Sequence, residues 1–337
     1  MSGAAEREAT TTTAAAVDAV VRAGGPRLAA LLERTEERLV ELAAGHGTTL
    51  ARHATATISA GGKRLRPLLV FLSAGEVADG AAEARLVRAA VAVELIHSAS
   101  LVHDDVLDAA ALRRGAPTVV AAAGRTIAIA TGDLLFSRAF AELAAGGGQL
   151  DDVRALSAAA SALAAGELVQ RADAWDAGIS LERYIRRCEL KTGSLFEAAC
   201  RLGALGTGGD VTDALALFGR RIGLAFQLLD DVLDVSGPAA RTGKARGTDL
   251  LDGTVTLPLI LGRERDPELA RLDLRALRTP ADAEEVCDRI AATGALVSAK
   301  EHALAVVEQA RRGLPLLPPA QQRALELVAE GVVERYA

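Results

Sequence analysis

The pentapeptide DDVLD occurs twice in the chain, at residues 104–108 and again at residues 230–234, each time after an apolar run. On a helix, the first and last aspartates of each copy lie four residues apart and share a face. Like charges at this spacing destabilise an isolated helix by about 0.2–0.5 kcal/mol per pair, and the negative end of the helix dipole adds to that cost. We therefore expect a cation at each copy.

The composition of both copies favours a hard divalent ion, because every candidate ligand is a carboxylate. An EF-hand is excluded, since no twelve-residue loop has the central glycine and terminal glutamate that it requires. Mg²⁺ typically takes one or two carboxylates and completes its shell with water and substrate phosphates. A solvated acidic helix end would explain one copy, but two identical copies favour a metal site. The predicted metal ligands are Asp104, Asp105, Asp108, Asp230, Asp231 and Asp234.

Basic residues that would bind phosphate stand out through an unusual composition. The chain has 38 lysines and arginines, of which four are lysines. Where arginine is used so consistently, a retained lysine indicates a need for a compact ammonium group. Lys63 lies in GGKRLRP, Lys191 in LKTGSLFEA and Lys244 in TGKARGTDL, whereas chance explains Lys300. The segment LRRG at residues 112–115 adds two arginines after the first aspartate copy.

Most of the chain has the apolar periodicity of helices. The predicted helices cover residues 26–45, 63–78, 84–105, 126–148, 153–174, 181–205 and 214–234. Residues 119–130 have a strand-like composition but continue into a helical pattern, so we expect helix there. No convincing strand pair is evident, and the predicted fold class is all-α. We expect residues 1–16 to form a flexible tail and residues 17–337 to form one domain.

Composition also limits the possible partners and location. A net charge of −6 and a pI near 5.5 do not suggest a nucleic-acid partner. No segment resembles a signal peptide or reaches about 18 uninterrupted apolar residues, so no transmembrane span is expected. Three cysteines without paired spacing fit buried, reduced thiols in a cytoplasmic protein. The Gly/Lys/Arg-rich residues 236–249 are a candidate lid or anion-binding loop.

These motifs resemble those of the trans-type polyprenyl diphosphate synthases, over nearly the whole chain after the tail. The matching segments, in the family's order, are GGKRLRP, ELIHSASLVHDDVLD, LRRG, TGDLLFSRAF, GELVQ, KTGSLFEAA, FQLLDDVLD, GKARGTDL and TLPLI. The resemblance implies antiparallel helices around a deep central cavity, the isoprenoid synthase type I fold, with the aspartate motifs facing each other across its mouth. It also implies a homodimer.

The resemblance further implies a Mg²⁺-dependent condensation. Three Mg²⁺ ions hold the diphosphate of an allylic substrate, such as farnesyl or geranylgeranyl diphosphate. Ionisation gives an allylic cation, the double bond of isopentenyl diphosphate attacks it, and a proton is lost. The residues expected at the allylic diphosphate are Arg113, Lys191, Thr192, Gln227 and Lys244, with Arg113, Lys191 and Lys244 as catalytic residues. Those expected at isopentenyl diphosphate are Lys63, Arg66, His97 and Arg114. His103 is expected to be structural.

The length of the product is expected to depend on residues just before the first aspartate motif. Ala99 and Ser100 lie five and four residues before Asp104, about 6–7.5 Å deeper along the helix. Both are small, whereas short-chain synthases usually close the cavity there with an aromatic residue. The predicted product is therefore a long-chain all-trans polyprenyl diphosphate, hexaprenyl to decaprenyl.

Alternatives remain at this point. A geranylgeranyl or farnesyl diphosphate synthase is the second hypothesis, and a non-catalytic regulatory subunit of a heteromeric synthase is the third. Such subunits typically lose aspartates from one motif, and this chain keeps all six. A class I terpene cyclase ranks last, because it would lack GGKRLRP. One departure from the family is Thr254, which stands where many relatives have a diphosphate-binding lysine.

Overall fold

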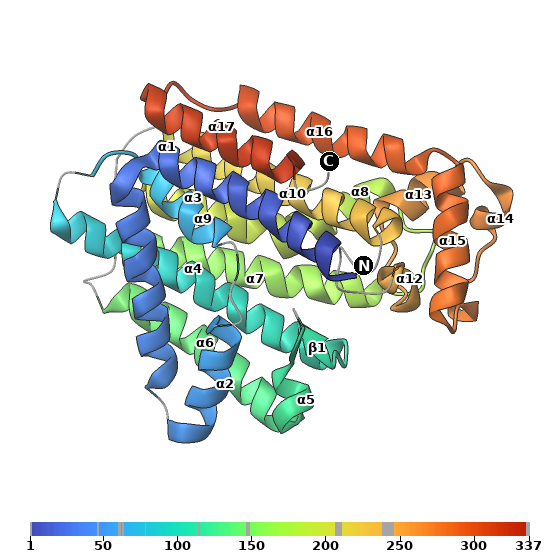
Figure 1. Cartoon of the computed structure of the whole chain (residues 1–337), viewed down its shortest axis with the longest axis horizontal. Helices are drawn as coiled ribbons and strands as arrows, with labels where there is room; N and C mark the ends of the chain where they lie inside the picture. The colour runs from blue at the N-terminus through green and yellow to red at the C-terminus, as the bar shows by residue number, and fades with distance from the viewer. Residues whose placement is uncertain are drawn as a thin grey trace.

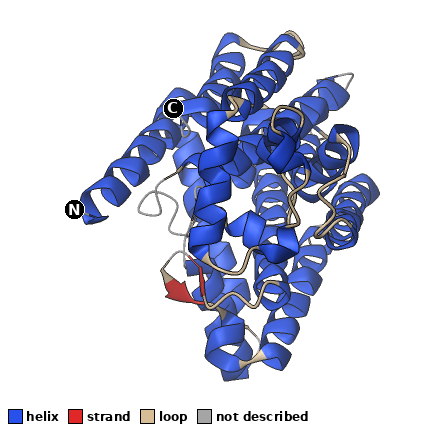
Figure 2. Ribbon diagram, turned by 90° about the vertical axis from the view of Figure 1, so that its right-hand side faces the viewer, coloured by secondary structure: helices blue, strands red, loops and turns tan. Residues whose placement is uncertain are grey.

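The computed structural model describes residues 2–45, 47–59, 62, 64–77, 79–113, 115–145, 149–205, 211–237 and 246–334, with side chains from Asp18 onward. The described chain is almost entirely helical (Figures 1 and 2). This confirms the predicted all-α class. The first half comprises α1 (Ser2–Ala44), α2 (Gly47–Ser59), α3 (Leu65–Ala74), α4 (Gly80–Leu107), β1 (Leu112–Arg113), β2 (Ala116–Pro117), α5 (Val119–Ala123), α6 (Arg125–Ala144) and α7 (Leu150–Ala172).

The second half continues the bundle and adds short helices at one end. It comprises α8 (Leu181–Cys188), η1 (Glu189–Gly193), α9 (Ser194–Ala204), α10 (Val211–Ser236), α12 (Thr248–Leu251), α13 (Leu257–Arg263), α14 (Pro267–Ala270), η2 (Leu274–Ala276), α15 (Pro280–Ala292), α16 (Ala295–Arg312) and α17 (Pro319–Glu334). In Figure 1 the short helices α12–α15 gather at the right-hand end, away from α2 and α3.

Two helices that are apolar on nearly every face form the centre of the bundle. In α4, residues 89–100 are buried except for His97, and in α10 the stretch 222–229 is mostly buried. Helix α4 packs against α3, α6 and α9, while α10 packs against α9 and α16. Each of these helices ends in one aspartate motif, so the packing that buries their apolar faces also fixes where the motifs lie.

Two stretches expected or found as helix are interrupted at glycines with a positive φ. Residues 2–16, expected as a tail, form the first part of α1. Helix α1 itself breaks at Gly25, which has a φ of 76° and precedes Pro26. Residues 119–130 are helical as predicted, but Gly124, with φ of 84°, separates α5 from α6. The flexibility of the tail and the single domain from residue 17 onward remain predictions.

One short antiparallel hairpin was not predicted. Strands β1 and β2 pair Leu112 with Pro117 and Arg113 with Ala116, and Gly115 turns between them with φ of 76°. The hairpin lies directly after the first aspartate motif, within LRRGAP. It therefore folds Arg113 back toward the end of α4.

Buried ion pairs connect the helices across the core. Arg85 of α4 bonds Asp152 of α7, and Arg64, before α3, bonds Glu94 of α4. Both carboxylates are almost fully buried, so each pair is an interior contact that fixes how two elements align, and neither is a surface ion pair. The three cysteines are buried and form no disulfide, as predicted.

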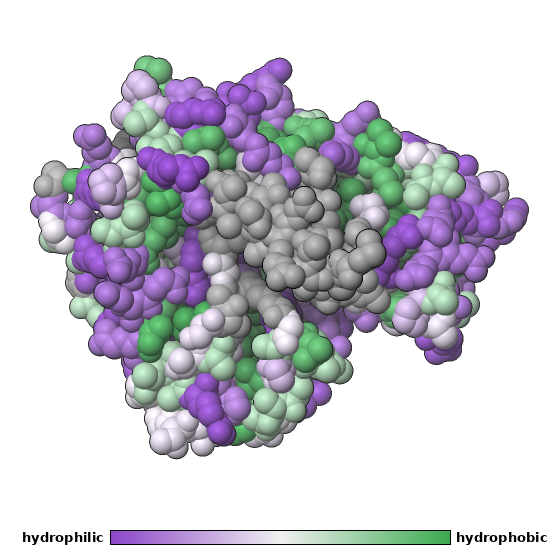
Figure 3. All heavy atoms as spheres, in the orientation of Figure 1, coloured by the Kyte–Doolittle hydropathy of each residue, from purple (hydrophilic) through white to green (hydrophobic). Residues whose placement is uncertain are grey.

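Helix α4 is long and apolar enough to cross a membrane by length and composition alone, and α15 and α16 pass the same test as a bent pair. Within the most apolar window of α4, 78% is buried inside the bundle, which is typical of a core helix. Hydrophilic residues cover much of the face seen in Figure 3, with hydrophobic residues in smaller patches.

Candidate active site

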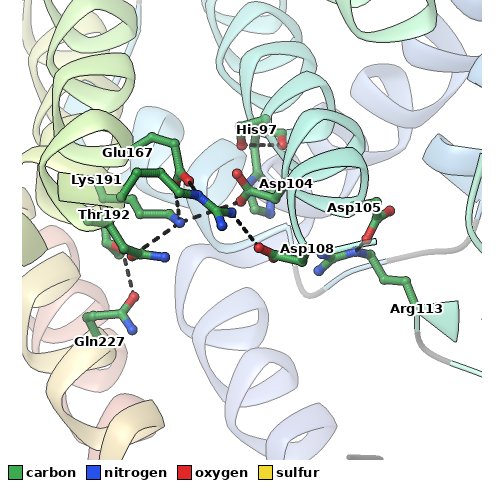
Figure 4. A network of polar contacts seen from close by, with 12 residues as sticks. His97, Asp104, Asp105, Asp108, Arg113, Glu167, Lys191, Thr192 and Gln227 are labelled. Atoms are coloured by element: carbon green, nitrogen blue, oxygen red, sulfur yellow. Dashed lines mark hydrogen bonds and ion pairs between the residues drawn. The ribbon is translucent and has the colours of Figure 1, made fainter. Parts of the chain in front are cut away.

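The first aspartate motif ends α4 and points its carboxylates in different directions. Asp104 faces Lys191, with 4.0 Å between the carboxylate Oδ2 and the ammonium Nζ. Asp108, which caps the helix, accepts a hydrogen bond of 2.6 Å from Arg171. Asp105 lies on the other side of the helix and accepts a hydrogen bond of 2.8 Å from Arg113 (Figure 4).

Glu167 of α7 joins the two cations that face the motif. Its carboxylate accepts a hydrogen bond of 2.5 Å from Lys191 and one of 2.8 Å from Arg171. Charges therefore alternate along Asp104, Lys191, Glu167, Arg171 and Asp108 (Figure 4). The two cations divide their charge among three carboxylates, which leaves one excess negative charge on this row.

The environment of these carboxylates shifts their protonation. Burial raises the pKa of Asp104 to about 6; attraction to Lys191 lowers it, and repulsion from Glu167 and Asp108 raises it. Burial would also raise the pKa of Glu167, but attraction to Lys191 and hydrogen bonds from Lys191 and Arg171 lower it below its ordinary value. Of these two carboxylates, Asp104 is thus the one that needs a further cation nearby to hold its charge.

Lys191 and Thr192 are presented by a single turn of π-helix. This turn, η1, interrupts a run of helix that the sequence predicts as continuous, and it begins directly after α8. Gly166 of α7 lets the turn approach closely, because a Cβ at that position would lie 2.6 Å from the backbone nitrogen of Lys191. A π-turn widens the helix locally and is frequent at functional sites.

A chain of hydrogen bonds leads from this turn to the second aspartate motif. The hydroxyl of Thr192 donates to the Oε1 of Gln227 at 2.8 Å, and the Nε2 of Gln227 donates to Asp231 at 2.7 Å. The other oxygen of Asp231 accepts a hydrogen bond of 2.5 Å from the hydroxyl of Tyr184. The structure therefore links the two motifs through η1.

The second motif is more deeply buried than the first. Asp231 is 3% exposed; burial, together with repulsion from Asp249, raises its pKa to about 7. Asp234 accepts a hydrogen bond of 3.3 Å from the backbone nitrogen of Asp249. Asp230 is partly exposed at the same end of α10. Burial raises the pKa of Tyr184 well above its ordinary value, so its hydroxyl stays protonated and donates.

The residues expected at isopentenyl diphosphate are described in part. Arg66 lies in the first turn of α3 with its guanidinium 4.5 Å from the ring centroid of Phe196, and His97 lies on α4 about two turns before Asp104. Lys63, Arg114 and Lys244 lie outside the described residues, as does most of the candidate loop at 236–249.

Ala99 and Ser100, the predicted floor, are both buried. The hydroxyl of Ser100 donates to the carbonyl of His97 at 2.8 Å, so it is bonded within its own helix. His103 stacks on Phe136 of α6 with ring centroids 5.9 Å apart, and it packs on Gly132 so closely that a Cβ there would clash. Its surroundings fit the structural role that we expected for it.

The donors present suit Mg²⁺ in chemistry. They are carboxylate oxygens, and burial, followed by repulsion from neighbouring carboxylates, raises the pKa of Asp104 and of Asp231, so both would gain from a cation. Among the residues that the structure describes, no three histidine, cysteine or acidic side chains come close enough to hold a metal ion by themselves. A metal bound here would need oxygen ligands from water or phosphate as well.

Three residues of this cluster were missed by sequence reasoning. Glu167 lies in GELVQ, which was recognised as a motif but given no role. Arg171 resembles an ordinary surface partner of Glu167 one turn away, and only the packing of α7 on α4 reveals its bond to Asp108. Tyr184 has the pattern of a core residue. Its one signal is rarity, since the chain has two tyrosines.

Comparison with known proteins identifies the class. Residues 48–293 match the family described as polyprenyl synthetase. A nonaprenyl diphosphate synthase of Mycobacterium tuberculosis is 35% identical over 329 residues, which cover 94% of each chain. The chain therefore belongs to the polyprenyl synthetase family, and the predicted family and enzyme class, prenyltransferase, are confirmed.

Solved structures agree with this assignment. The crystal structure of a decaprenyl diphosphate synthase from Rhodobacter capsulatus matches with a TM-score of 0.86 at 30% identity, over 95% of this chain and 99% of that chain. A polyprenyl synthase from Caulobacter crescentus, complexed with calcium and isoprenyl diphosphate, matches with a TM-score of 0.82 at 33% identity, over 95% and 98%. The predicted isoprenoid synthase type I fold is confirmed.

The close approach of α7 and η1 is testable. Gly166→Ala is expected to destabilise the protein by about 1–3 kcal/mol, because the new methyl group must displace the backbone of Lys191. Gly80→Ala is the control, since a Cβ there meets nothing within 4 Å, and it should be neutral or slightly stabilising. Urea unfolding measures both. Equal stability of Gly166→Ala and the wild type would contradict the close contact.

Proposed function

We propose that this protein condenses isopentenyl diphosphate with an allylic diphosphate, such as farnesyl or geranylgeranyl diphosphate, to make a long-chain all-trans polyprenyl diphosphate. One observation carries the proposal: Asp104 and Asp108 of the first motif converge with Lys191 and Arg171 at the C-terminal end of α4. Support for a long product comes from the nonaprenyl and decaprenyl diphosphate synthases to which the chain is similar.

We propose that the two aspartate motifs bind Mg²⁺, as three ions when diphosphate is present. The proposed ligands are Asp104, Asp105, Asp108, Asp230, Asp231 and Asp234. Bound Mg²⁺ would act as a Lewis acid that stabilises the charge developing on the leaving diphosphate. The relative from Caulobacter crescentus, with calcium and isoprenyl diphosphate, supports divalent-cation binding in this fold. The excess negative charge beside Asp104 is the matching feature of this chain.

The basic residues have two tasks in this proposal. Lys191 and Arg113 hold the allylic diphosphate together with Thr192, Gln227 and Lys244. Before substrate binds, Lys191 and Arg171 are engaged by Glu167 and the motif aspartates. When a diphosphate enters, its oxygens compete for these cations. The aspartates are then released to bind metal, so substrate and metal binding are coupled.

The second substrate in this proposal is isopentenyl diphosphate. The residues proposed to bind it are Lys63, Arg66 and His97, which precede the first motif in sequence, and Arg114, which follows it. The stacking of Arg66 on Phe196 fixes the direction of its guanidinium, which suits recognition of a phosphate group. Because Thr254 replaces a lysine that many relatives have, we propose that Lys244 contributes more to diphosphate binding here.

The chain length is proposed to depend on Ala99 and Ser100. Both are small and buried on α4, one turn deeper than Asp104, and a growing chain that passes them would meet no aromatic side chain at these positions. We also propose a homodimer in the cytoplasm.

Removing a metal ligand tests the mechanism. Asp104→Asn keeps the shape of the side chain but removes its charge, and we expect turnover to fall by about a hundredfold or more, the scale of one lost electrostatic contact in a transition state. The assay contains Mg²⁺, isopentenyl diphosphate and farnesyl diphosphate. Asp213→Asn, an exposed position on the same helix as the second motif, is the control and should retain activity. Normal turnover by Asp104→Asn would refute the metal assignment.

Filling the floor tests the chain length. Ala99→Phe is expected to shorten the product without abolishing turnover, because the aromatic ring blocks the path of the growing chain, and sizing of the extracted products measures this. Ala303→Phe adds the same volume to another buried site, on α16, and should lower stability without shortening the product. Wild-type products that stop at twenty carbons would contradict the long-chain proposal, and unchanged products from Ala99→Phe would refute the floor.

A further inference from the structure

Tyr184 is a fully buried tyrosine whose hydroxyl bonds the second aspartate motif. It lies on α8, is 0% exposed, and donates a hydrogen bond of 2.5 Å to Asp231. The guanidinium of Arg187, one turn later, lies 5.3 Å from the centroid of its ring and donates a hydrogen bond to the carbonyl of Val255. Arg187 therefore covers the ring and joins α8 to the loop before α13, while the hydroxyl of Tyr184 is directed to Asp231.

The hydrogen bond from Tyr184 orients the next two residues in turn. With one oxygen bonded to Tyr184, Asp231 presents the other to the amide nitrogen of Gln227 at 2.7 Å. The amide oxygen of Gln227 is then directed to the hydroxyl of Thr192, which donates to it at 2.8 Å. Each acceptor and donor in this row has one compatible orientation, because a carboxylate accepts and an amide nitrogen donates.

The row ends at Thr192, whose neighbour Lys191 faces the first motif. Thr192 is adjacent to Lys191 in the π-helical turn, and Lys191 reaches Glu167 and Asp104 (Figure 4). A residue with no access to solvent thus connects, through three hydrogen bonds and the backbone between Thr192 and Lys191, to the cation that faces Asp104.

We propose that Tyr184 is a positioning residue for the allylic diphosphate site: through Asp231, Gln227 and Thr192 it sets the η1 turn that presents Lys191. The inference rests on the proposed function and deepens it. Phenylalanine at this position would fill the same space without the hydroxyl, so the positioning role is assigned to the hydroxyl group of Tyr184. A buried hydroxyl without a partner is costly, and a hydrogen-bonded row of this kind specifies one arrangement of its members.

The kinetic test is Tyr184→Phe. We expect the KM for farnesyl diphosphate to rise about tenfold, the scale of one lost hydrogen bond, while the KM for isopentenyl diphosphate stays within about twofold. The difference arises because the row of hydrogen bonds ends at Thr192, beside Lys191, and includes neither Arg66 nor His97. Thr35→Val is the control: it removes another buried hydroxyl, bonded to Leu31 on α1, and should change neither constant.

A spectroscopic test does not require Tyr184→Phe to fold. The chain has two tyrosines, so 3-fluorotyrosine labelling of Tyr336→Phe leaves one ¹⁹F resonance, that of Tyr184. We expect this resonance to shift when Mg²⁺ and inorganic pyrophosphate are added, although the ring is buried. In Gln227→Leu the row is broken, so the shift should become smaller at concentrations of pyrophosphate that still raise the Tm, because only metal bound at Asp231 can then affect the ring.

The outcomes separate the two proposals. If the wild type elongates no substrate, the proposed function fails. If it does elongate, but Tyr184→Phe has an unchanged KM for farnesyl diphosphate, the inference is wrong. It is equally wrong if the ¹⁹F resonance is unmoved by saturating pyrophosphate, if Gln227→Leu leaves the shift intact, or if Tyr184→Phe raises both KM values equally.

Discussion

Carboxylates placed at the ends of buried apolar helices, and themselves partly buried, are the constraint on which the rest of this structure depends. Asp104 and Asp231 both have a raised pKa, chiefly because burial disfavours their charge. Like charges in this position must be compensated by cations. The fold meets this need around the first motif with Lys191, Arg171 and Arg113, and leaves an excess of negative charge that suits divalent metal ions.

The hydrophobic core and the polar site are therefore parts of one arrangement. The faces of α4 that pack against α3, α6 and α9 bring Asp104 to α7 and to the π-turn, and the packing of α10 on α9 brings Gln227 to the same turn. The close approach at Gly166 admits the backbone of Lys191. A turn of only five residues thus lies between the two aspartate motifs, paired with Asp104 directly and with Asp231 through Gln227.

The features that could be predicted from the sequence are those that depend on a local pattern of residues. The helices around both DDVLD copies follow from apolar periodicity, and the aspartates stand out because the same pentapeptide occurs twice. Glu167 and Arg171 were not predicted, because their pairing with the first motif depends on which helix packs beside α4. The π-turn and the hairpin at Arg113 were missed because each is a short departure from a regular pattern, decided by tertiary contacts. The break between α5 and α6 did have a signal in the sequence, because glycine readily adopts the positive φ that Gly124 has there.

The central claim is that metal and diphosphate complete this site together. Titration calorimetry of Mg²⁺ binding, with and without inorganic pyrophosphate, tests it most directly. Because no three donor side chains converge among the described residues, the account predicts weak uptake of Mg²⁺ alone and tight, cooperative uptake once pyrophosphate is present. Tight Mg²⁺ binding without pyrophosphate, or pyrophosphate binding of equal strength without Mg²⁺, would contradict it.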